Sequence, residues 1–166
     1  SKIYMSPSEY LIARNISKIF SCIYFCKNEM ESWYELVKNK KRKRVVTLHN
    51  NLKLDNLIKN KQTFLISWDK SKIDMPIYDI VNFYNRYALN FDFKGLLSEY
   101  ERIFPLLEDE KKLLSVLISI PEKIINTKSE YEMVKSVRHL LDKIYKTERF
   151  YENKVTSIDK LCDLNK

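Results

Sequence analysis

The stretch Leu48-His49-Asn50-Asn51-Leu52-Lys53-Leu54-Asp55-Asn56-Leu57-Ile58 decides how the rest of this chain is interpreted. It is polar in the middle, and β-branched and apolar residues precede it at Val45-Val46-Thr47-Leu48. After it come an Asn60-Lys61 turn and the apolar run Phe64-Leu65-Ile66-Ser67-Trp68. β-branched and aromatic residues favour strands, and Asn favours turns. The pattern predicts short strands around a polar loop, with a small β-hairpin after it.

Helical periodicity flanks this β region on both sides. Ser6-Pro7-Ser8-Glu9 combines an N-cap serine, a proline at the first helical position and a glutamate at the third, which is typical of a helix start. The spacing of apolar residues predicts helices over residues 7–25, 28–38, 76–89, 93–103, 107–120 and 129–150. The expected fold class is mainly α with a small β-hairpin region.

The size and composition of the chain suit one domain. With 166 residues, 45% of them hydrophobic, the chain can bury one substantial core, and no Gly/Ser linker divides it. We therefore expect a single domain over 1–166. No run of about 18 apolar residues and no secretion signal is present, so the expected location is cytoplasmic, with no membrane partner. Because the chain begins with Ser1 rather than Met, a processed or excised piece of a longer protein is one interpretation.

The net charge is +8, which suits nucleic acid, an anionic membrane surface or an acidic substrate as partner. The charge gathers in Lys38-Asn39-Lys40-Lys41-Arg42-Lys43-Arg44, with six basic residues in seven positions. No aromatic residue lies between them for base stacking. The run therefore favours a solvated connection between a helix and a strand, and a basic helical nucleic-acid-binding domain stays open as an alternative.

The three cysteines do not form a zinc-binding pattern. Cys22 and Cys26 lie four residues apart within a predicted helix, with no Cys/His pair at zinc spacing nearby. They are interpreted as reduced thiols in the core.

The loop segment resembles the catalytic loop of the small-molecule kinases of the aminoglycoside phosphotransferase and choline kinase type. That family shows His-Gly-Asp-Leu-His-x-x-Asn on this loop, and His49, Leu52 and Asn56 match it. Where the family has its Gly, its catalytic Asp and its second His, this chain has Asn50, Asn51 and Lys53.

A second family motif, Ile-Asp-Trp or Ile-Asp-Phe at the end of a hairpin, permits two alignments. In one, Asp69 supplies the metal-binding carboxylate through a shifted register. In the other, Ser67 occupies the metal position, and Asp69 matches the acidic residue that often follows the aromatic. The second needs no gap before Pro76 and Asp79, which match the family's following Gly-Asp-Pro-x-x-Asp-Leu.

The resemblance implies a kinase-like C-terminal lobe whose motif-bearing core covers about 45–80. The nucleotide-binding lobe is expected to be absent, because only 48 residues precede His49 and they have helical patterns. The single glycine, Gly95, lies in a predicted helix, so there is no Gly-rich phosphate loop and no nucleotide-binding residue is assigned.

The resemblance also assigns roles to individual residues. His49 and Asp79 would brace the loop. Asn51 would stand at the position of the catalytic base, and Asn56 and Asp69 are the candidate metal ligands.

The chemistry of these residues argues against catalysis. Phosphoryl transfer depends on Mg²⁺ and on an aspartate that orients the incoming hydroxyl, whereas an asparagine carries no charge and accepts no proton at neutral pH. We expect a chain that is inactive by itself, has no cofactor, and binds or scaffolds a protein partner or a missing N-terminal lobe. The alternative is a fragment of an active small-molecule kinase whose full-length form uses Mg²⁺ and ATP.

Overall fold

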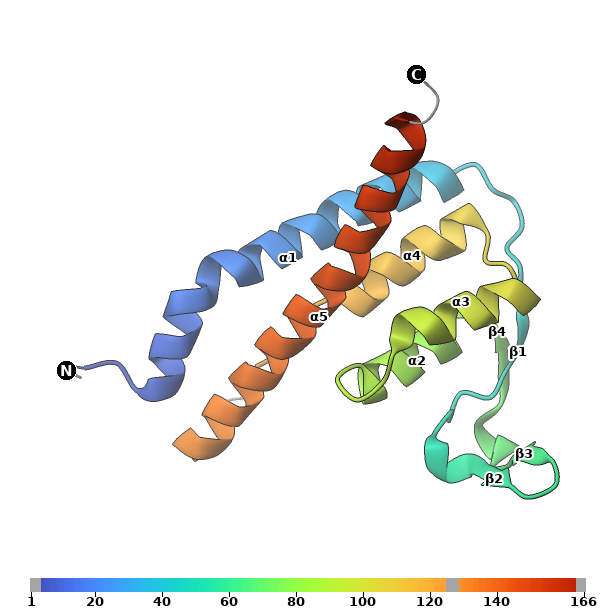
Figure 1. The fold of residues 1–166 in the computed structure, drawn as a ribbon, viewed down its shortest axis with the longest axis horizontal. Coiled ribbons are helices and arrows are strands. Elements are labelled where there is room, and N and C mark those ends of the chain that lie inside the picture. The colour runs from blue at the N-terminus through green and yellow to red at the C-terminus, as the bar shows by residue number, and fades with distance from the viewer. Residues whose placement is uncertain (1–3, 125–128, 164–166) are drawn as a thin grey trace. The chain divides into compact units, whose positions relative to one another are not determined.

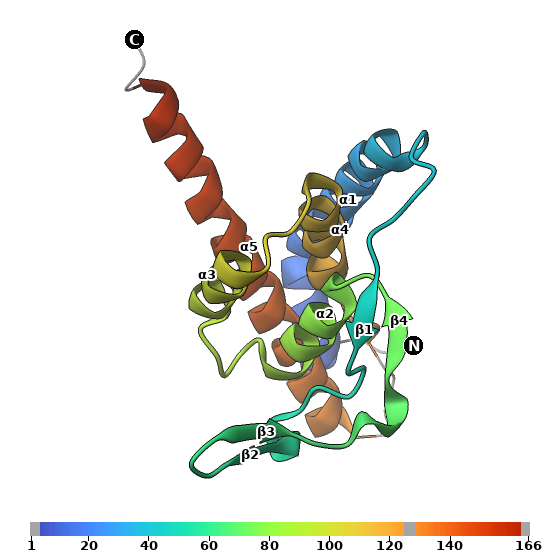
Figure 2. The same ribbon diagram turned by 90° about the vertical axis from the view of Figure 1, so that its right-hand side faces the viewer.

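The computed structural model describes residues 4–124 and 129–163, with side chains described as far as Tyr151. It is mainly helical with two small antiparallel sheets, which confirms the coarse fold class (Figures 1 and 2). Within the described ranges, no helix has both the length and the apolar character needed to cross a membrane. The elements are α1 (Pro7–Val37), β1 (Val46–Leu48), β2 (Leu57–Lys59), β3 (Thr63–Leu65), β4 (Lys72–Asp74), α2 (Ile77–Tyr87), α3 (Phe93–Ile103), α4 (Glu108–Ser119) and α5 (Glu130–Asp163).

The chain divides into two compact units. Unit 1 comprises Ser1–Asn28 and Ser119–Lys166, and unit 2 comprises Glu29–Ile118. A single domain over residues 1–166 remains a prediction, since compact units can belong to one domain.

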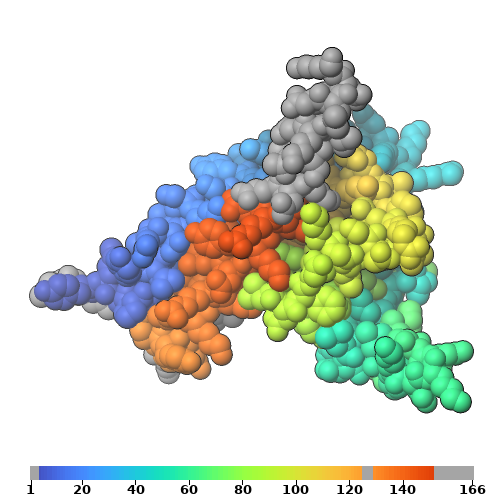
Figure 3. All heavy atoms as spheres, in the orientation of Figure 1, coloured from blue at the N-terminus to red at the C-terminus, as the bar shows by residue number. Residues whose placement is uncertain are grey.

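Unit 1 is built from the first part of α1 and from α5. The predicted helix start is confirmed, because the Ser6 amide donates to Glu9 Oε2 at 2.8 Å and the Glu9 amide donates to Ser6 Oγ at 3.4 Å. The Ser8 amide donates to Glu130 Oε1 at 2.6 Å, which joins the start of α1 to the start of α5, and Figure 3 shows the two segments side by side. The buried apolar residues of α5 recur at helical spacing: Val137, Leu140, Leu141 and Ile144.

Besides shifts of one or two residues at the ends of α2 and α4, three features differ from the sequence-based expectations. The helices expected over 7–25 and 28–38 form one helix, α1, because no Pro or Gly interrupts them and the buried Cys26 continues the apolar face. The last helix was expected over 129–150 and continues to Asp163. Strand β4 was not expected, because Ile73 is the only β-branched or aromatic residue among its three residues.

Unit 2 holds both sheets and the helices α2 and α3. β1 pairs antiparallel with β4, with Val46 opposite Asp74 and Leu48 opposite Lys72, and β2 pairs antiparallel with β3. This pairing brings the two ends of the 46–74 segment together. Tyr84 of α2 and Phe93 of α3 are both buried and pack edge to face, with ring centroids 4.5 Å apart.

A buried ion pair fixes the connection that leads into β1. The carboxylate of Glu110 in α4 is almost fully buried and accepts from Arg44 Nε at 2.9 Å and from the Leu107 amide at 2.9 Å. Arg44 also donates to the Pro105 carbonyl at 3.0 Å, and its guanidinium lies 4.3 Å from the Phe104 ring centroid. Hydrogen bonding to Glu110 raises the pKa of Arg44, so the guanidinium stays charged.

The basic run of residues 38–44 is largely paired within unit 2. Besides Arg44, three of its lysines lie within ion-pair distance of carboxylates of the same unit: Lys38 with Glu35, Lys40 with Asp109 at 2.9 Å, and Lys43 with Asp74 at 3.4 Å. Charges that are paired internally contribute less to a phosphate-binding surface.

Candidate functional site

The polar loop between β1 and β2 is braced by one carboxylate of α2. Asp79, in the first turn of that helix, accepts from the His49 amide at 2.7 Å through Oδ2 and from the Asn50 amide at 2.8 Å through Oδ1. Each carboxylate oxygen therefore binds one backbone amide. Hydrogen bonds to an ionised group are stronger than neutral ones, so Asp79 fixes where the loop begins.

The side chain of His49 connects the loop to the segment after β3. The residue is buried, with 2% of its surface exposed, and its Nε2 lies 2.7 Å from the Ile66 carbonyl. The Asn51 amide donates to Nδ1 at 3.3 Å. Because Nδ1 accepts, Nε2 is assigned as the protonated nitrogen that donates to Ile66. The imidazole also packs edge to face against Trp68, with ring centroids 4.8 Å apart.

Asn51 and Asn56, two further residues of the motif, are joined by a hydrogen bond. Asn56 Nδ2 donates to the Asn51 carbonyl at 2.8 Å, and the Asn56 carbonyl accepts from the Ile66 amide at 2.9 Å. The Leu54 amide donates to the Tyr87 hydroxyl at 3.1 Å, which ties the loop to the end of α2. The sequence analysis did not identify Tyr87, because nothing in its spacing distinguishes it from the other tyrosines of that helix.

Two residues of this region adopt the left-handed backbone conformation that favours glycine. Asn50 has φ 56°, at the place where the family motif has Gly, and Asn tolerates this conformation better than most residues. Ser67 has φ 65° and ψ 54°, with no side-chain cap to compensate. The family's Gly signals the first position, whereas no sequence signal marked the second.

The donors of this region do not fit Mg²⁺, which usually takes one or two carboxylates. Asn51 and Ser67 are neutral, and both carboxylate oxygens of Asp79 accept from the loop amides. Asp69 is exposed, in a short 3₁₀ helix. Among residues 4–124 and 129–151, no cluster of three or more His, Cys, Asp or Glu side chains could hold a metal ion. The assignment of Asn56 and Asp69 as metal ligands stays a prediction.

A cavity of about 610 Å³ lies beside the loop within unit 2. Its walls come mainly from β1, the loop, α2 and α3, and they are mostly apolar, with Thr47, Asp79, Glu99 and Tyr100 as the polar exceptions. Burial raises the pKa of the Tyr100 phenol, so this residue stays protonated and can donate a hydrogen bond. The loop thus borders a space that could hold a small, mainly apolar group.

Comparison of the chain with protein family models, with curated proteins and with solved structures gives no match. The function of the chain is therefore inferred from the geometry of the loop and from the motif resemblance.

Proposed function

We propose that this chain is a kinase-like phosphotransferase C-terminal lobe that does not transfer phosphate by itself and acts in binding or scaffolding. The observation that carries the proposal is a loop held in place by the hydrogen bonds of His49 and Asp79. The motif resemblance gives Asn51 the position of the catalytic base in this loop. A loop with this bracing keeps its shape without the charges that phosphoryl transfer needs.

The neutral side chains of the loop account for the loss of activity. Asn51 cannot take a proton from an acceptor hydroxyl, and Ser67 offers a metal ion only a weak neutral oxygen. Without a metal ion, the charge of a transferring phosphoryl group would be left uncompensated.

The β2–β3 hairpin supports a binding role. Three of the large apolar side chains at this hairpin and just after it are about half exposed, at 49% for Ile58, 52% for Phe64 and 47% for Trp68. The hairpin projects from the rest of unit 2 (Figures 1 and 2). A two-stranded sheet is only marginally stable alone, and clustered exposed apolar groups mark interaction surfaces. A protein partner or a β-rich N-terminal lobe would cover this hairpin.

Manganese titration tests the assignment of the loop. Mn²⁺ prefers the same oxygen ligands as Mg²⁺ and broadens the NMR signals of nearby amides. In the unsubstituted chain we expect no selective broadening at Asn51 or Asn56. The double variant Asn51→Asp, Ser67→Asp supplies two carboxylates beside Asn56 and should gain broadening at these amides.

A control places two negative charges in the β2–β3 turn instead, as Asn60→Asp with Gln62→Asp, and should leave the loop amides sharp. If the control broadens them as strongly as the Asn51 and Ser67 pair does, the assignment of these positions is wrong.

Addition of Mg-ATP tests the loss of activity directly. A ligand at about 100 times its Kd stabilises a protein by about 2.7 kcal/mol, which would raise the melting temperature by several degrees. We expect no rise in the unsubstituted chain. A rise of that size, or phosphate release above background, would refute the proposed inactivity.

A further inference from the structure

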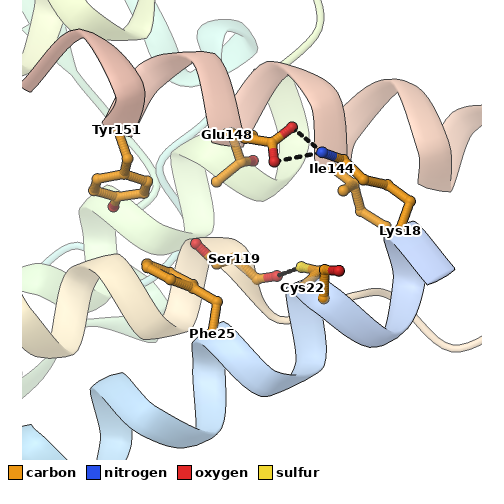
Figure 4. A pocket seen from close by; sticks show the side chains of 9 residues that line it. Lys18, Cys22, Phe25, Ser119, Ile144, Glu148 and Tyr151 are labelled. Atoms are coloured by element: carbon orange, nitrogen blue, oxygen red, sulfur yellow. Dashed lines mark hydrogen bonds and ion pairs between the residues drawn. The ribbon is translucent and has the colours of Figure 1, made fainter. Parts of the chain in front are cut away.

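Unit 1 contains a second cavity, of about 260 Å³, that the proposed function does not use. It lies between α1, the last residue of α4 and α5 (Figure 4). At one end the rings of Phe25 and Tyr151 lie with their centroids 6.0 Å apart. At the other end Lys18 forms an ion pair with Glu148. The cavity therefore has an aromatic end and a charged but internally neutralised end.

Several polar side chains that line this cavity are bonded to the protein itself. The Cys22 thiol donates to the Ser119 carbonyl at 3.0 Å. The hydroxyls of Ser21 and Thr147 donate to backbone carbonyls one turn earlier in their own helices, at 2.9 Å and 2.8 Å. Lys18 and Glu148 satisfy each other.

The side-chain hydroxyl of Ser119 is different. The residue is 6% exposed, and its Oγ has no hydrogen-bond partner among the described residues. Most buried polar groups in proteins are paired, and leaving one unpaired costs stability. Ser119 Oγ is therefore an unpaired hydrogen-bonding group that is covered within the wall of a mostly apolar cavity.

We propose that this cavity binds a small neutral aromatic molecule that carries one hydroxyl or amide group. The ring packs against Phe25 and Tyr151, and the polar group bonds to Ser119 Oγ. An engineered apolar cavity of about 150 Å³ holds benzene, so the larger volume here has room for a ring with a head group. Because Lys18 and Glu148 neutralise each other, the site offers no net charge for an ion to pair with.

Cys22 provides a reporter within the cavity wall. A hydrogen bond from Cys26 lowers the pKa of Cys22, whereas the pKa of Cys26 is raised. Iodoacetamide reacts with thiolates, so it should label Cys22 before Cys26. The rate of labelling, measured by mass spectrometry on the peptide that contains Cys22, reports whether the cavity is occupied.

The test compares benzyl alcohol with toluene on the full chain. The two molecules differ by one hydroxyl, and ligands of this size reach affinities of about 1 mM. We expect benzyl alcohol to slow the labelling of Cys22 with half-protection near about 1 mM. In Ser119→Ala, the concentration for half-protection by benzyl alcohol should rise roughly three- to ten-fold, as expected for one lost hydrogen bond, and that for toluene should not change.

Ser115→Ala is the matched control. Ser115 lies one turn earlier in α4, is similarly buried at 7% exposure, and donates its hydroxyl to the Lys112 carbonyl at 2.7 Å instead of lining the cavity. This variant should bind both molecules as the unsubstituted chain does. The proposal is overturned if neither molecule protects Cys22 at about ten times the expected half-protection concentration. It is equally overturned if Ser119→Ala weakens both molecules to the same extent.

Discussion

The loop of unit 2 and the cavity of unit 1 use their polar groups in opposite ways. In the loop, Asp79 accepts two backbone amides, and both ring nitrogens of His49 are engaged. In the cavity, the buried Ser119 Oγ has no partner among the described residues. Polar groups that are already hydrogen-bonded within the protein hold the segment in its shape but are not free to bind a ligand. An unpaired buried hydroxyl, by contrast, forms a hydrogen bond when a ligand binds, and this bond stabilises the complex. This difference favours a structural role for the loop and a ligand-binding role for the cavity.

Asp79→Ala should have the largest effect, because it removes the acceptor for two amides at once. Each hydrogen bond to a charged group contributes about 1.5–3 kcal/mol, so we expect a loss of at least about 3 kcal/mol in the free energy of unfolding. Denaturant titration measures the loss, and hydrogen exchange should show faster exchange at the His49 and Asn50 amides.

Asp92→Ala is the control for that loss. Asp92 caps α3 at an exposed site and accepts from a single amide, that of Gly95, at 3.2 Å. Loss of such a cap costs about 1 kcal/mol. If both variants lose the same stability, Asp79 does no more than an ordinary helix cap.

Ser119→Ala should stabilise the unliganded protein, by about 1 kcal/mol, because it removes a buried hydroxyl that has no partner. Ser115→Ala removes a hydroxyl that is bonded and should instead cost about 1 kcal/mol. The gain in helix propensity is larger at Ser115, which is internal to α4, than at Ser119, its last residue, and this acts against the expected order. A higher free energy of unfolding for Ser119→Ala than for Ser115→Ala therefore reports the pairing of the hydroxyls. Equal effects would mean that Ser119 Oγ is paired in solution.

Features set by neighbouring residues could be predicted from the sequence. Ser6 and Glu9 carry a local capping pattern, and the helix over 93–103 has the predicted bounds. The bond from the His49 amide to Asp79 spans 30 residues, and only the motif resemblance drew attention to both.

Features that depend on tertiary packing could not be predicted. Among the described residues, Ser119 Oγ has no partner because of the side chains that surround it in the folded chain, and a serine at that place looks like any other in the sequence. Strand β4 exists because its three residues pair with β1, rather than through its own composition. The left-handed conformation of Ser67 arises from a chain reversal between β3 and β4 that has no glycine to mark it.

Ser67→Gly should relieve this conformation at a position that one of the two alignments with the kinase motif gives to a metal-binding aspartate. The left-handed conformation costs a residue with a Cβ about 1–2 kcal/mol, and glycine avoids this cost. Glycine also loses more conformational entropy on folding, which offsets part of the gain, so we expect a net stabilisation of about 0.5 kcal/mol. Asn50→Gly should gain less, because Asn tolerates this conformation. Thermal unfolding of the two variants gives the order, and the reverse order would contradict the backbone angles of the loop.

Glu130→Gln should have the smallest effect and one that depends on pH. Glu130 accepts from the Ser8 amide in an exposed position. This bond, together with hydrogen bonds from the side chains of Ser8 and Ser6, lowers the pKa of its carboxyl. A carboxyl with a lowered pKa in the folded state stabilises the protein above its ordinary pKa of about 4.3, and this contribution is lost as the pH falls through the lowered value. The unsubstituted chain should therefore melt at a higher temperature than Glu130→Gln at pH 7, and the difference should shrink toward pH 3.

Glu132→Gln, which changes the other acid in the first turn of α5, is the control and should show a smaller difference at pH 7. A difference for Glu130→Gln that is the same at both pH values would mean that the charge of Glu130 does not contribute to holding the starts of α1 and α5 together.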